Sequence, residues 1–404
     1  MDRDNGQILF PTGERQRKTI LSVVFVILIC LVGIGLIALV HRLPQNPFIA
    51  SLKTTPTPTP DPMAPKNVLL LGYGGAGHDG GLLTDTMIVA RIIPKEKKLI
   101  LISIPRDLWV QVEAKAGETK GFKINAVYAI GTDSRAYPDK PSKYLGGDGG
   151  LIMTKDVLEK IIGEPIDFAV AIDFSGFTKL MTTLGGIFID VPFTFEDKFY
   201  PVKGKEKETC GKSEEDIQKV TATLSGTLLE EEFPCRYETI KFEKGKQFMD
   251  GETALRFVRS RHSDINGGDF GRSQRQQAFL LGVKNRLLSF AGVTKLIPLF
   301  KDGLAMVDTD ITIGDVTAMI ERYGTISSYT VDSIAITDQT VLTITTSADG
   351  QYILVPKTGE EGWGSVATYI SDELMKIRNA STSADMNKDE KELELFLKLK
   401  NCKK

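Results

Sequence analysis

A run of 22 residues without a charged side chain, from Thr19 to Val40, constrains this chain more than any other stretch. The run is rich in Ile, Leu and Val, and as a helix it would span roughly 33 Å, enough to cross the hydrocarbon core of a bilayer. It is too long for the apolar part of a cleaved signal peptide, and no small-residue cleavage site of the A-x-A type follows it. We therefore expect an uncleaved, single transmembrane helix over residues 19–41.

The charges beside this run predict its orientation. Three basic residues in GERQRK precede it, whereas only His41 and Arg42 follow it. Because the cytoplasmic flank of a membrane helix carries the excess of Lys and Arg, we expect residues 1–18 in the cytoplasm and the rest of the chain outside the cell. Residues 42–66 contain TTPTPTPDP, and such a sequence favours an extended, semi-rigid linker that holds the folded part away from the membrane.

Strand-like and helix-like segments alternate through residues 67–378, which predicts one α/β domain. The expected strands are 67–72, 87–92, 99–103, 168–172, 187–191, 333–345 and 352–356, and the expected helices are 151–162, 175–184, 307–322 and 364–378. Residues 379–404 are rich in Lys and Glu and indicate a polar C-terminal tail.

The composition excludes some classes of function. The formal net charge is −2 for 404 residues, so bulk charge gives no argument for a nucleic-acid partner. No CxxC or HExxH motif occurs, which argues against a structural zinc site.

Residues 196–244 have mixed charge and indicate an insertion. Its two cysteines, Cys210 and Cys235, could form a disulfide in an extracytoplasmic compartment.

The stretch from Asp250 to Phe290 concentrates the candidate chemistry. It predicts two helices around a Gly-rich loop at 263–268, with Asp250 as the N-cap of the first helix and Asp269 able to cap the second. Five cationic side chains are expected to converge on this loop: Arg256, Arg259, Arg261, Arg272 and Arg275.

The second of these helices carries a stripe that changes character along its length. Arg272, Arg275 and Gln276 share one face near its start, where free N–H groups also favour an anion, and the face turns apolar at Phe279 and Val283. This pattern suits a ligand with a phosphate head and a hydrocarbon tail. A solvated basic helix end above an ordinary core stripe explains it equally well.

Several segments in order then resemble the LytR–CpsA–Psr family of membrane-anchored cell-envelope enzymes. They cover most of residues 67–290, and it is their order and spacing that carry the resemblance. They are NVLLLG…TDTMIVA, SIPRD, KINAVYAIG, IDFAVAIDFSGFTKLMTTLGGIFIDV and the segment from Asp250 to Gln277.

The resemblance implies a fold and a reaction. The fold is a three-layer domain with a central mixed sheet flanked by helices, and a long apolar pocket for a polyprenyl chain. The reaction moves an anionic glycopolymer from a polyprenyl-pyrophosphate carrier to a hydroxyl of a cell-wall glycan such as peptidoglycan, and releases polyprenyl phosphate. It uses Mg²⁺ or Mn²⁺. Hydrolysis of the pyrophosphate, with water as acceptor, is a possible side activity.

The resemblance also implies site residues. Arginine forks and a divalent ion suit a pyrophosphate on which charge builds as the bond breaks. The positions that match the family's pyrophosphate contacts are Arg106, Lys123, Arg259, Arg261, Arg272, Arg275 and Gln276. Asp85 matches its metal-associated aspartate. Phe168, Val170, Ile172, Phe177, Leu180, Phe279 and Val283 are expected in the core, where some could line the lipid pocket.

The chain departs from the family pattern at two positions. Tyr73 stands twelve residues before Asp85, where the family usually has a second aspartate, and Leu83 stands where it often has an arginine. Asp79 or His78, in the same GYGGAGHDGG loop, could replace the missing metal ligand. Alternatively, the glycine N–H groups of this loop could bind phosphate.

Two carboxylates near the arginines have alternative roles. Asp107 could act as the general base toward the incoming hydroxyl, or it could orient Arg106 through a bidentate pair, which we favour. Asp269 could reach the metal or activate the acceptor, although capping its helix is the simpler role. Asn125 could bond a phosphate oxygen or cap a helix.

Two classes of function therefore remain open. The first is the phosphotransferase, with Arg106, Asp107, Arg259, Arg261 and Asp269 as its catalytic candidates. The second is a non-catalytic, membrane-anchored receptor for a polyprenyl-phosphate lipid or an anionic envelope polymer, which Tyr73 in place of a metal ligand favours. Loss of turnover on chelation of the metal would indicate the enzyme.

Overall fold

A six-stranded mixed sheet forms the centre of the protein in this computed structural model, which describes residues 61–288 (apart from 79, 225, 264 and 266), 307–323 and 329–380. Its strand order is β11-β6-β1-β2-β3-β12. The strands are β1 (Lys66–Tyr73), β2 (Thr84–Ile93), β3 (Lys98–Ser103), β6 (Phe168–Asp173), β11 (Asp308–Thr309) and β12 (Thr330–Ala335). β1 is antiparallel to β2 and parallel to β6, and β3 is antiparallel to β2 and parallel to β12.

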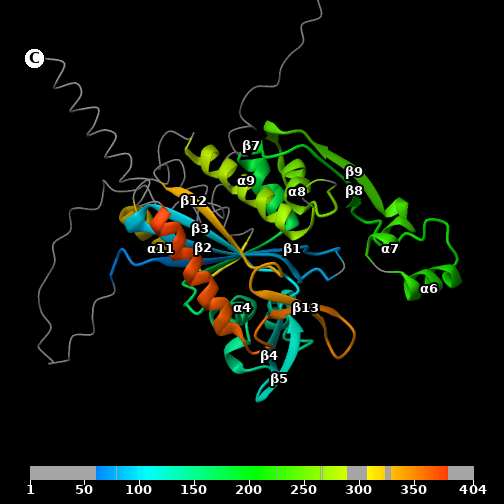
Figure 1. Ribbon diagram of the computed structural model, residues 1–404, viewed down its shortest axis with the longest axis horizontal. Helices are drawn as coiled ribbons and strands as arrows, with labels where there is room; N and C mark the ends of the chain where they lie inside the picture. The colour runs from blue at the N-terminus through cyan, green and yellow to red at the C-terminus, as the bar shows by residue number, and fades with distance from the viewer. Residues whose placement is uncertain are drawn as a thin grey trace, which may run out of the picture.

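Each face of the sheet has its own core, because successive side chains of a strand point to opposite faces. In β1, Val68 packs into one core, and Leu69 and Leu71 pack into the other. Helices and hairpins cover both faces, so the molecule has the three-layer α/β arrangement that the sequence predicts (Figure 1).

The helices α5 (Phe174–Thr183), α8 (Gly251–Arg259), α9 (Gly268–Leu288) and α11 (Ile313–Tyr323) cover the first face. The second face is covered by α3 (Val127–Thr132), α4 (Gly149–Ile162), a C-terminal helix at residues 363–380, and two hairpins. These hairpins are β4 (Trp109–Lys115) with β5 (Glu118–Lys123), and β13 (Leu342–Thr346) with β14 (Tyr352–Pro356).

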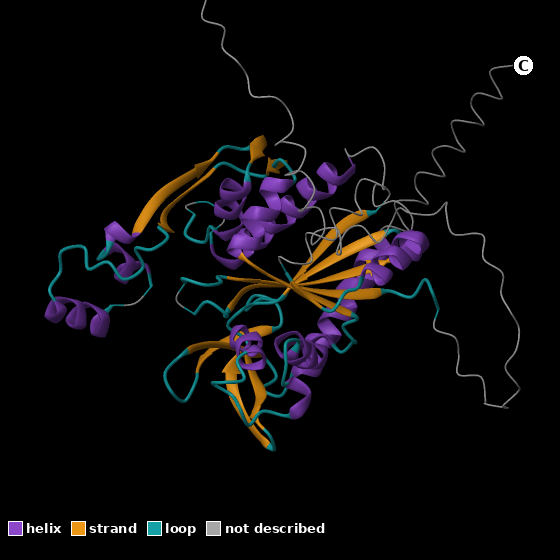
Figure 2. Ribbon diagram, turned by 180° about the vertical axis from the view of Figure 1, so that it is seen from behind, coloured by secondary structure: helices purple, strands orange, loops and turns teal. Residues whose placement is uncertain are grey.

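The predicted insertion is a long arm that extends from the side of the first layer (Figure 2). It contains the β8–β9 hairpin, with two helices between its strands. The disulfide that the sequence allowed joins Cys210 to Cys235 within it. The elements of this region are β7 (Ile187–Val191), β8 (Phe195–Pro201), α6 (Glu214–Thr223), α7 (Thr227–Glu231), β9 (Tyr237–Phe242) and β10 (Gly245–Met249).

Most of the expected elements are present, but some boundaries were wrong. β2 begins at Thr84, so Asp85 lies on a strand and not in the preceding loop. Residues 307–322 form β11 and then α11 instead of one helix, and residues 333–345 belong to two strands. The β4–β5 hairpin was not expected.

The predicted membrane-spanning run at 19–41 lies outside the described residues, as do most of the linker at 42–66 and nearly all of the tail at 379–404. Among the residues that are described, no helix has the length and apolar character needed to cross a membrane.

The disulfide of the arm gives a first testable prediction. It closes a gap of 25 residues around α6 and α7, neither of which contains a buried residue. Loss of the cross-link should therefore lower the local stability of the arm by about 3.5 kcal/mol, mainly through the entropy of the opened chain. In a Cys210→Ser/Cys235→Ser variant, limited proteolysis between these positions should become at least tenfold faster. Equal cleavage rates in the variant and the oxidised protein would contradict this expectation.

Candidate active site

The two helices expected after Asp250 are α8 and α9, joined by a loop at residues 260–267. The side chain of Asp250 accepts a hydrogen bond of 2.8 Å from the N–H of Thr253, so the predicted N-cap of α8 is confirmed. α9 begins at Gly268, so Asp269 lies inside its first turn and not at the cap, and its side chain is outside the described part of the chain.

The buried carboxylate of Asp197, from β8, fixes the start of this loop. It is 1% exposed, and its Oδ2 accepts from the hydroxyl of Ser260 at 2.7 Å and from the N–H groups of Arg261 and His262 at 3.0 and 3.1 Å. A buried carboxylate is stable only when donors satisfy it, and here the backbone supplies most of them. Sequence analysis missed Asp197 because it lies in the insertion, far from the loop in sequence.

Arg275 is fully buried behind the same loop. It donates to the carbonyl of Ser260 at 2.5 Å and to the hydroxyl of Ser263 at 3.3 Å, and its guanidinium lies 4.8 Å from the Phe195 ring centre. Burial lowers the pKa of Arg275 to about 10, and the charge of Asp197 opposes this shift. Arg275 therefore stays charged at neutral pH, and these contacts hold the loop.

Asp85 contacts cations from two distant segments of the chain. Its Oδ1 accepts a 2.6 Å hydrogen bond from Nη1 of Arg106, and Nη2 of Arg261 lies 3.9 Å from the same oxygen. Arg106 follows the exit of β3 and Arg261 lies in the loop after α8. The three side chains are between a quarter and a half exposed, so they remain accessible from solution.

Asp107 bridges two cations, and one of them is Arg106, the partner expected from the sequence. Its Oδ1 accepts from Nζ of Lys123 at 2.7 Å, and its Oδ2 lies 3.5 Å from Nε of Arg106. Lys123 ends β5, and the N–H of Asn125 bonds to the carbonyl of Arg106 at 3.3 Å. The unexpected β4–β5 hairpin therefore brings Lys123 and Asn125 to the site.

The remaining predicted contacts lie where α8 and α9 meet the sheet. Arg259 donates to the hydroxyl of Tyr200 at 3.1 Å and stacks 4.0 Å from the ring centre of Phe174. Gln276 donates to the hydroxyl of Thr86 at 3.1 Å, and Arg272 is buried beside it.

Arg256 does not join this cluster. It is 42% exposed, and its Nη2 lies 3.1 Å from a carboxylate oxygen of Glu238 in the arm. The five arginines expected around the loop therefore divide into three groups. Arg259, Arg261 and Arg272 face the site, Arg275 supports the loop from below, and Arg256 points away.

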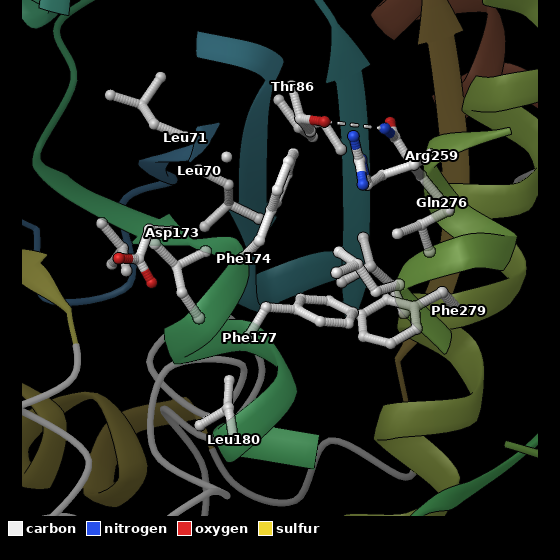
Figure 3. A pocket seen from close by; sticks show the side chains of 17 residues that line it. Leu70, Leu71, Thr86, Asp173, Phe174, Phe177, Leu180, Arg259, Gln276 and Phe279 are labelled. Carbon is white, nitrogen blue, oxygen red and sulfur yellow. Dashed lines mark hydrogen bonds between the residues drawn. The ribbon is translucent and has the colours of Figure 1, made fainter. Parts of the chain in front are cut away.

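An apolar cavity of about 130 Å³ lies between the sheet and the helices α5, α8 and α9. Figure 3 shows Arg259, Gln276 and Thr86 at one end of it and Leu180 at the other. Five of the core residues expected near a lipid pocket line it, namely Val170, Ile172, Phe177, Leu180 and Phe279. Leu70, Ile88, Leu255 and Val258 also line it and were not anticipated. The polar groups at one end and the apolar wall beyond match a ligand with an anionic head and a hydrocarbon tail.

Tyr73, at the position of the usual second aspartate, is half-buried and belongs to an aromatic pair. Its ring centre lies 5.3 Å from that of Tyr128, whose hydroxyl donates to Asp308 at 2.7 Å. Burial, and then the charge of Asp173, raise the pKa of Tyr73, so it is a neutral phenol at pH 7. This position offers no carboxylate to a cation.

The predicted metal ligands are only partly described. Asp79 lies outside the described residues, and the ring of His78 packs edge-on against Phe174, with Nδ1 3.8 Å from Glu206. Within the described ranges, no group of three or more His, Cys, Asp or Glu side chains could hold a metal ion. Asp85 therefore offers one hard oxygen ligand, which fits Mg²⁺ only if phosphate oxygens and water complete its shell.

Comparison with known proteins identifies the family of this chain. A model of the LytR_cpsA_psr family matches residues 46–361, which is most of the chain. The chain belongs to this family. Among curated proteins, it is 30% identical over 278 residues to the polyisoprenyl-teichoic acid–peptidoglycan teichoic acid transferase TagV of Bacillus subtilis, covering 68% of this chain and 56% of TagV. It is 27% identical over 251 residues to TagU of Bacillus licheniformis, covering 62% and 61%. The matches thus span less than two thirds of these relatives.

Two solved structures share the fold of this chain. The crystal structure of B. subtilis TagV aligns with a TM-score of 0.50 at 25% identity, covering 77% of this chain and 98% of that one. The protein gbs0355 from Streptococcus agalactiae aligns with a TM-score of 0.52 at 20% identity, covering 77% and 88%. The central mixed sheet flanked by helices that the resemblance implied is therefore confirmed.

The anchoring of the loop by Asp197 can be tested by substitution. Asp197→Ala removes the acceptor of three loop donors and also the negative charge that favours the charged form of the buried Arg275. We expect a loss of about 3–5 kcal/mol in the free energy of unfolding, measured by urea denaturation. Glu196→Ala, on the outer side of the same strand, should change it by no more than about 0.5 kcal/mol. Equal stability of the two variants would exclude the anchoring role.

Proposed function

We propose that this protein transfers a glycopolymer from a polyprenyl-pyrophosphate carrier to a hydroxyl of a cell-wall glycan and releases polyprenyl phosphate. One observation carries the proposal: Asp85, Arg106 and Arg261, from three parts of the chain, meet near an apolar cavity whose polar end holds Arg259 and Gln276. Membership of a family whose relatives are named as teichoic acid transferases supports it. The proposal places the catalytic domain outside the cell, anchored by residues 19–41.

The chemistry needed at each atom follows from this arrangement. The acceptor hydroxyl oxygen attacks the phosphorus that carries the glycopolymer, and the bond from that phosphorus to the bridging oxygen breaks. Polyprenyl phosphate leaves with the electron pair. The guanidinium groups of Arg106, Arg259 and Arg261 stabilise the charge that builds on the phosphate oxygens, because charge-assisted hydrogen bonds strengthen as that charge grows.

The other site residues take supporting roles in this proposal. Asp107 accepts the proton of the acceptor hydroxyl, and Lys123 keeps the carboxylate in place through its 2.7 Å contact. Arg272 and Gln276 lie at the sheet side of the pyrophosphate. Arg275 supports the loop and does not contact substrate, since its donors engage Ser260 and Ser263. Asp269 remains a candidate for the acceptor side.

The residues that would hold a divalent ion are Asp85 and, from the glycine-rich loop, Asp79. Such an ion, when bound, would neutralise charge on the pyrophosphate oxygens. Because the protein offers few ligands, we expect binding of Mg²⁺ or Mn²⁺ to depend on the substrate's phosphates.

Substitution of the cationic residues tests the assignment of the site. Arg106→Ala and Arg261→Ala should each lower release of polyprenyl phosphate at least 100-fold, with unchanged circular dichroism and melting temperature. Arg256→Ala is the matched control, since this exposed arginine lies on the helix that carries Arg259 and pairs with Glu238. It should retain more than half of the activity. Full turnover in the Arg106 and Arg261 variants would show that the reaction occurs elsewhere.

A chelator distinguishes the enzyme hypothesis from the receptor hypothesis, which is the alternative that Tyr73 favours. With the full chain and a polyprenyl-pyrophosphate sugar as donor, EDTA should stop release of polyprenyl phosphate, and excess Mg²⁺ should restore it. Tight donor binding without turnover, equal with and without EDTA, would instead establish the receptor.

A further inference from the structure

A second cavity, lined by charged, amide and aromatic side chains, adjoins Arg106 and Asp107, and the roles proposed above leave it unassigned. Its volume is about 620 Å³, and its walls come from the β4–β5 hairpin and from the turn between β13 and β14. The first strands of the two hairpins pack into the core of the second sheet face, whereas the apolar cavity lies in the core of the first face. Arg106 and Asp107 line this second cavity, and Arg106 also bonds to Asp85, which precedes Thr86 in the lining of the apolar cavity.

The two hairpins are held together by backbone contacts, so the cavity has fixed walls. Leu108 pairs with Leu354 as a parallel bridge, and the N–H of Leu354 donates to the carbonyl of Asp107 at 2.9 Å. Nζ of Lys123 lies 6.0 Å from the ring centre of Tyr352 on β14. The same backbone that presents Asp107 to the active site therefore also positions the cavity.

An aromatic side chain packs directly against a glycine in the lining of this cavity. Trp109 and Gly121 both line it, from β4 and β5. A Cβ atom on Gly121 would lie 2.5 Å from three atoms of the Trp109 indole, so only glycine lets the ring rest against the strand. The φ angle of Gly121 is not positive, so its backbone conformation does not require glycine. Glycine is needed here because any side chain would collide with the indole.

The charge and hydrogen-bonding groups of the cavity indicate the ligand. Three cations, Arg106, Lys120 and Lys123, line the cavity together with two carboxylates, Asp107 and Asp349. Most of the positive charge is therefore offset, and a polyanion gains little. Asn125 and Gln351 supply both donors and acceptors. An aromatic plane bordered by amides and carboxylates is complementary to a sugar ring, which has an apolar C–H face and a rim of hydroxyl groups.

The position of the cavity indicates which sugar it holds. In an in-line displacement, the attacking oxygen approaches phosphorus opposite the leaving group. If the polyprenyl phosphate leaves toward the apolar cavity, as the proposed function requires, the acceptor must enter from the opposite side. We propose that this cavity binds a hexose ring of the acceptor glycan, stacked on Trp109, with a hydroxyl directed at Asp107. The assignment of the sugar to the acceptor rests on the proposed function, which sets the direction of attack. The binding of a carbohydrate by this cavity does not depend on that function.

Steady-state kinetics of the full chain test the assignment to the acceptor. Trp109→Ala should raise the KM for a muramidase-released wall-glycan tetrasaccharide about tenfold and leave the KM for the lipid-linked donor within twofold. Gly121→Ala should weaken acceptor binding in the same direction, because it displaces the indole without removing it. Gly147→Ala is the matched control, since a Cβ there meets no atom within 4 Å, and it should behave as wild type. A raised donor KM with an unchanged acceptor KM would overturn the assignment.

Fluorescence gives a readout that does not depend on turnover. The chain has two tryptophans, so a Trp363→Phe variant leaves Trp109 as its sole reporter. Titration with the tetrasaccharide should change its emission saturably, and Gly121→Ala in this background should raise the Kd. A saturable change in a protein without transferase activity would support the carbohydrate cavity while the proposed function failed. Normal turnover with no emission change and no KM effect would reject the cavity alone.

Discussion

Like charges concentrated at one place repel one another, and the site of this protein depends on carboxylates that hold its cations together before any anion arrives. Asp85 attracts Arg106 and Arg261, and Asp107 attracts Arg106 and Lys123. These five side chains are partly exposed, so solvent screens each pair and none contributes much stability by itself. Their effect is positional, because each carboxylate joins cations from segments that are distant in sequence.

The buried support behind the loop differs physically from these exposed pairs. Asp197 and Arg275 lie out of water, where an unsatisfied charge would cost several kcal/mol. Asp197 is satisfied mainly by loop N–H groups and Arg275 partly by a loop carbonyl, so the backbone of the loop is specified as well as the side chains. The arm that supplies Asp197 is thus coupled to the site, although most of it extends away from the sheet (Figure 1).

Two cavities of different character lie near the exit of β3. One is apolar and lies over the first face of the sheet, and the other has charged and amide side chains in its lining and lies beside the hairpins of the second face. Arg106 and Asp107 line the second cavity, and Arg106 bonds to Asp85, which precedes Thr86 in the lining of the first. An arrangement of this kind suits a reaction that joins a lipid-linked donor to a hydrophilic acceptor. Tyr73 packs against Tyr128 and carries no charge, so the negative charges beside Arg106, Arg261 and Lys123 are those of Asp85 and Asp107.

The sequence by itself determined the elements with strong local signals. Continuous apolar runs such as NVLLLG predicted buried strands, Asp250 predicted a helix start, and the spacing of the cysteines in the arm allowed their disulfide. Ordered motifs also predicted the family and its mixed sheet, and they named Arg106 and Arg261, which the fold brings to the same carboxylate of Asp85.

Tertiary structure decided what depends on contacts between distant segments. The direction in which an arginine side chain points is set by its contacts. Arg256 and Arg275 carry the same charge as Arg261, but Arg256 pairs with the arm and Arg275 supports the loop. Asp197 had no local motif that linked it to the site, because the loop donors that it accepts from are more than sixty residues away. The β4–β5 hairpin has short, mixed strands whose pairing partners a linear pattern does not reveal. Hence the sequence specified the chemistry of the site, and packing alone decided which charges meet and which cavities surround them.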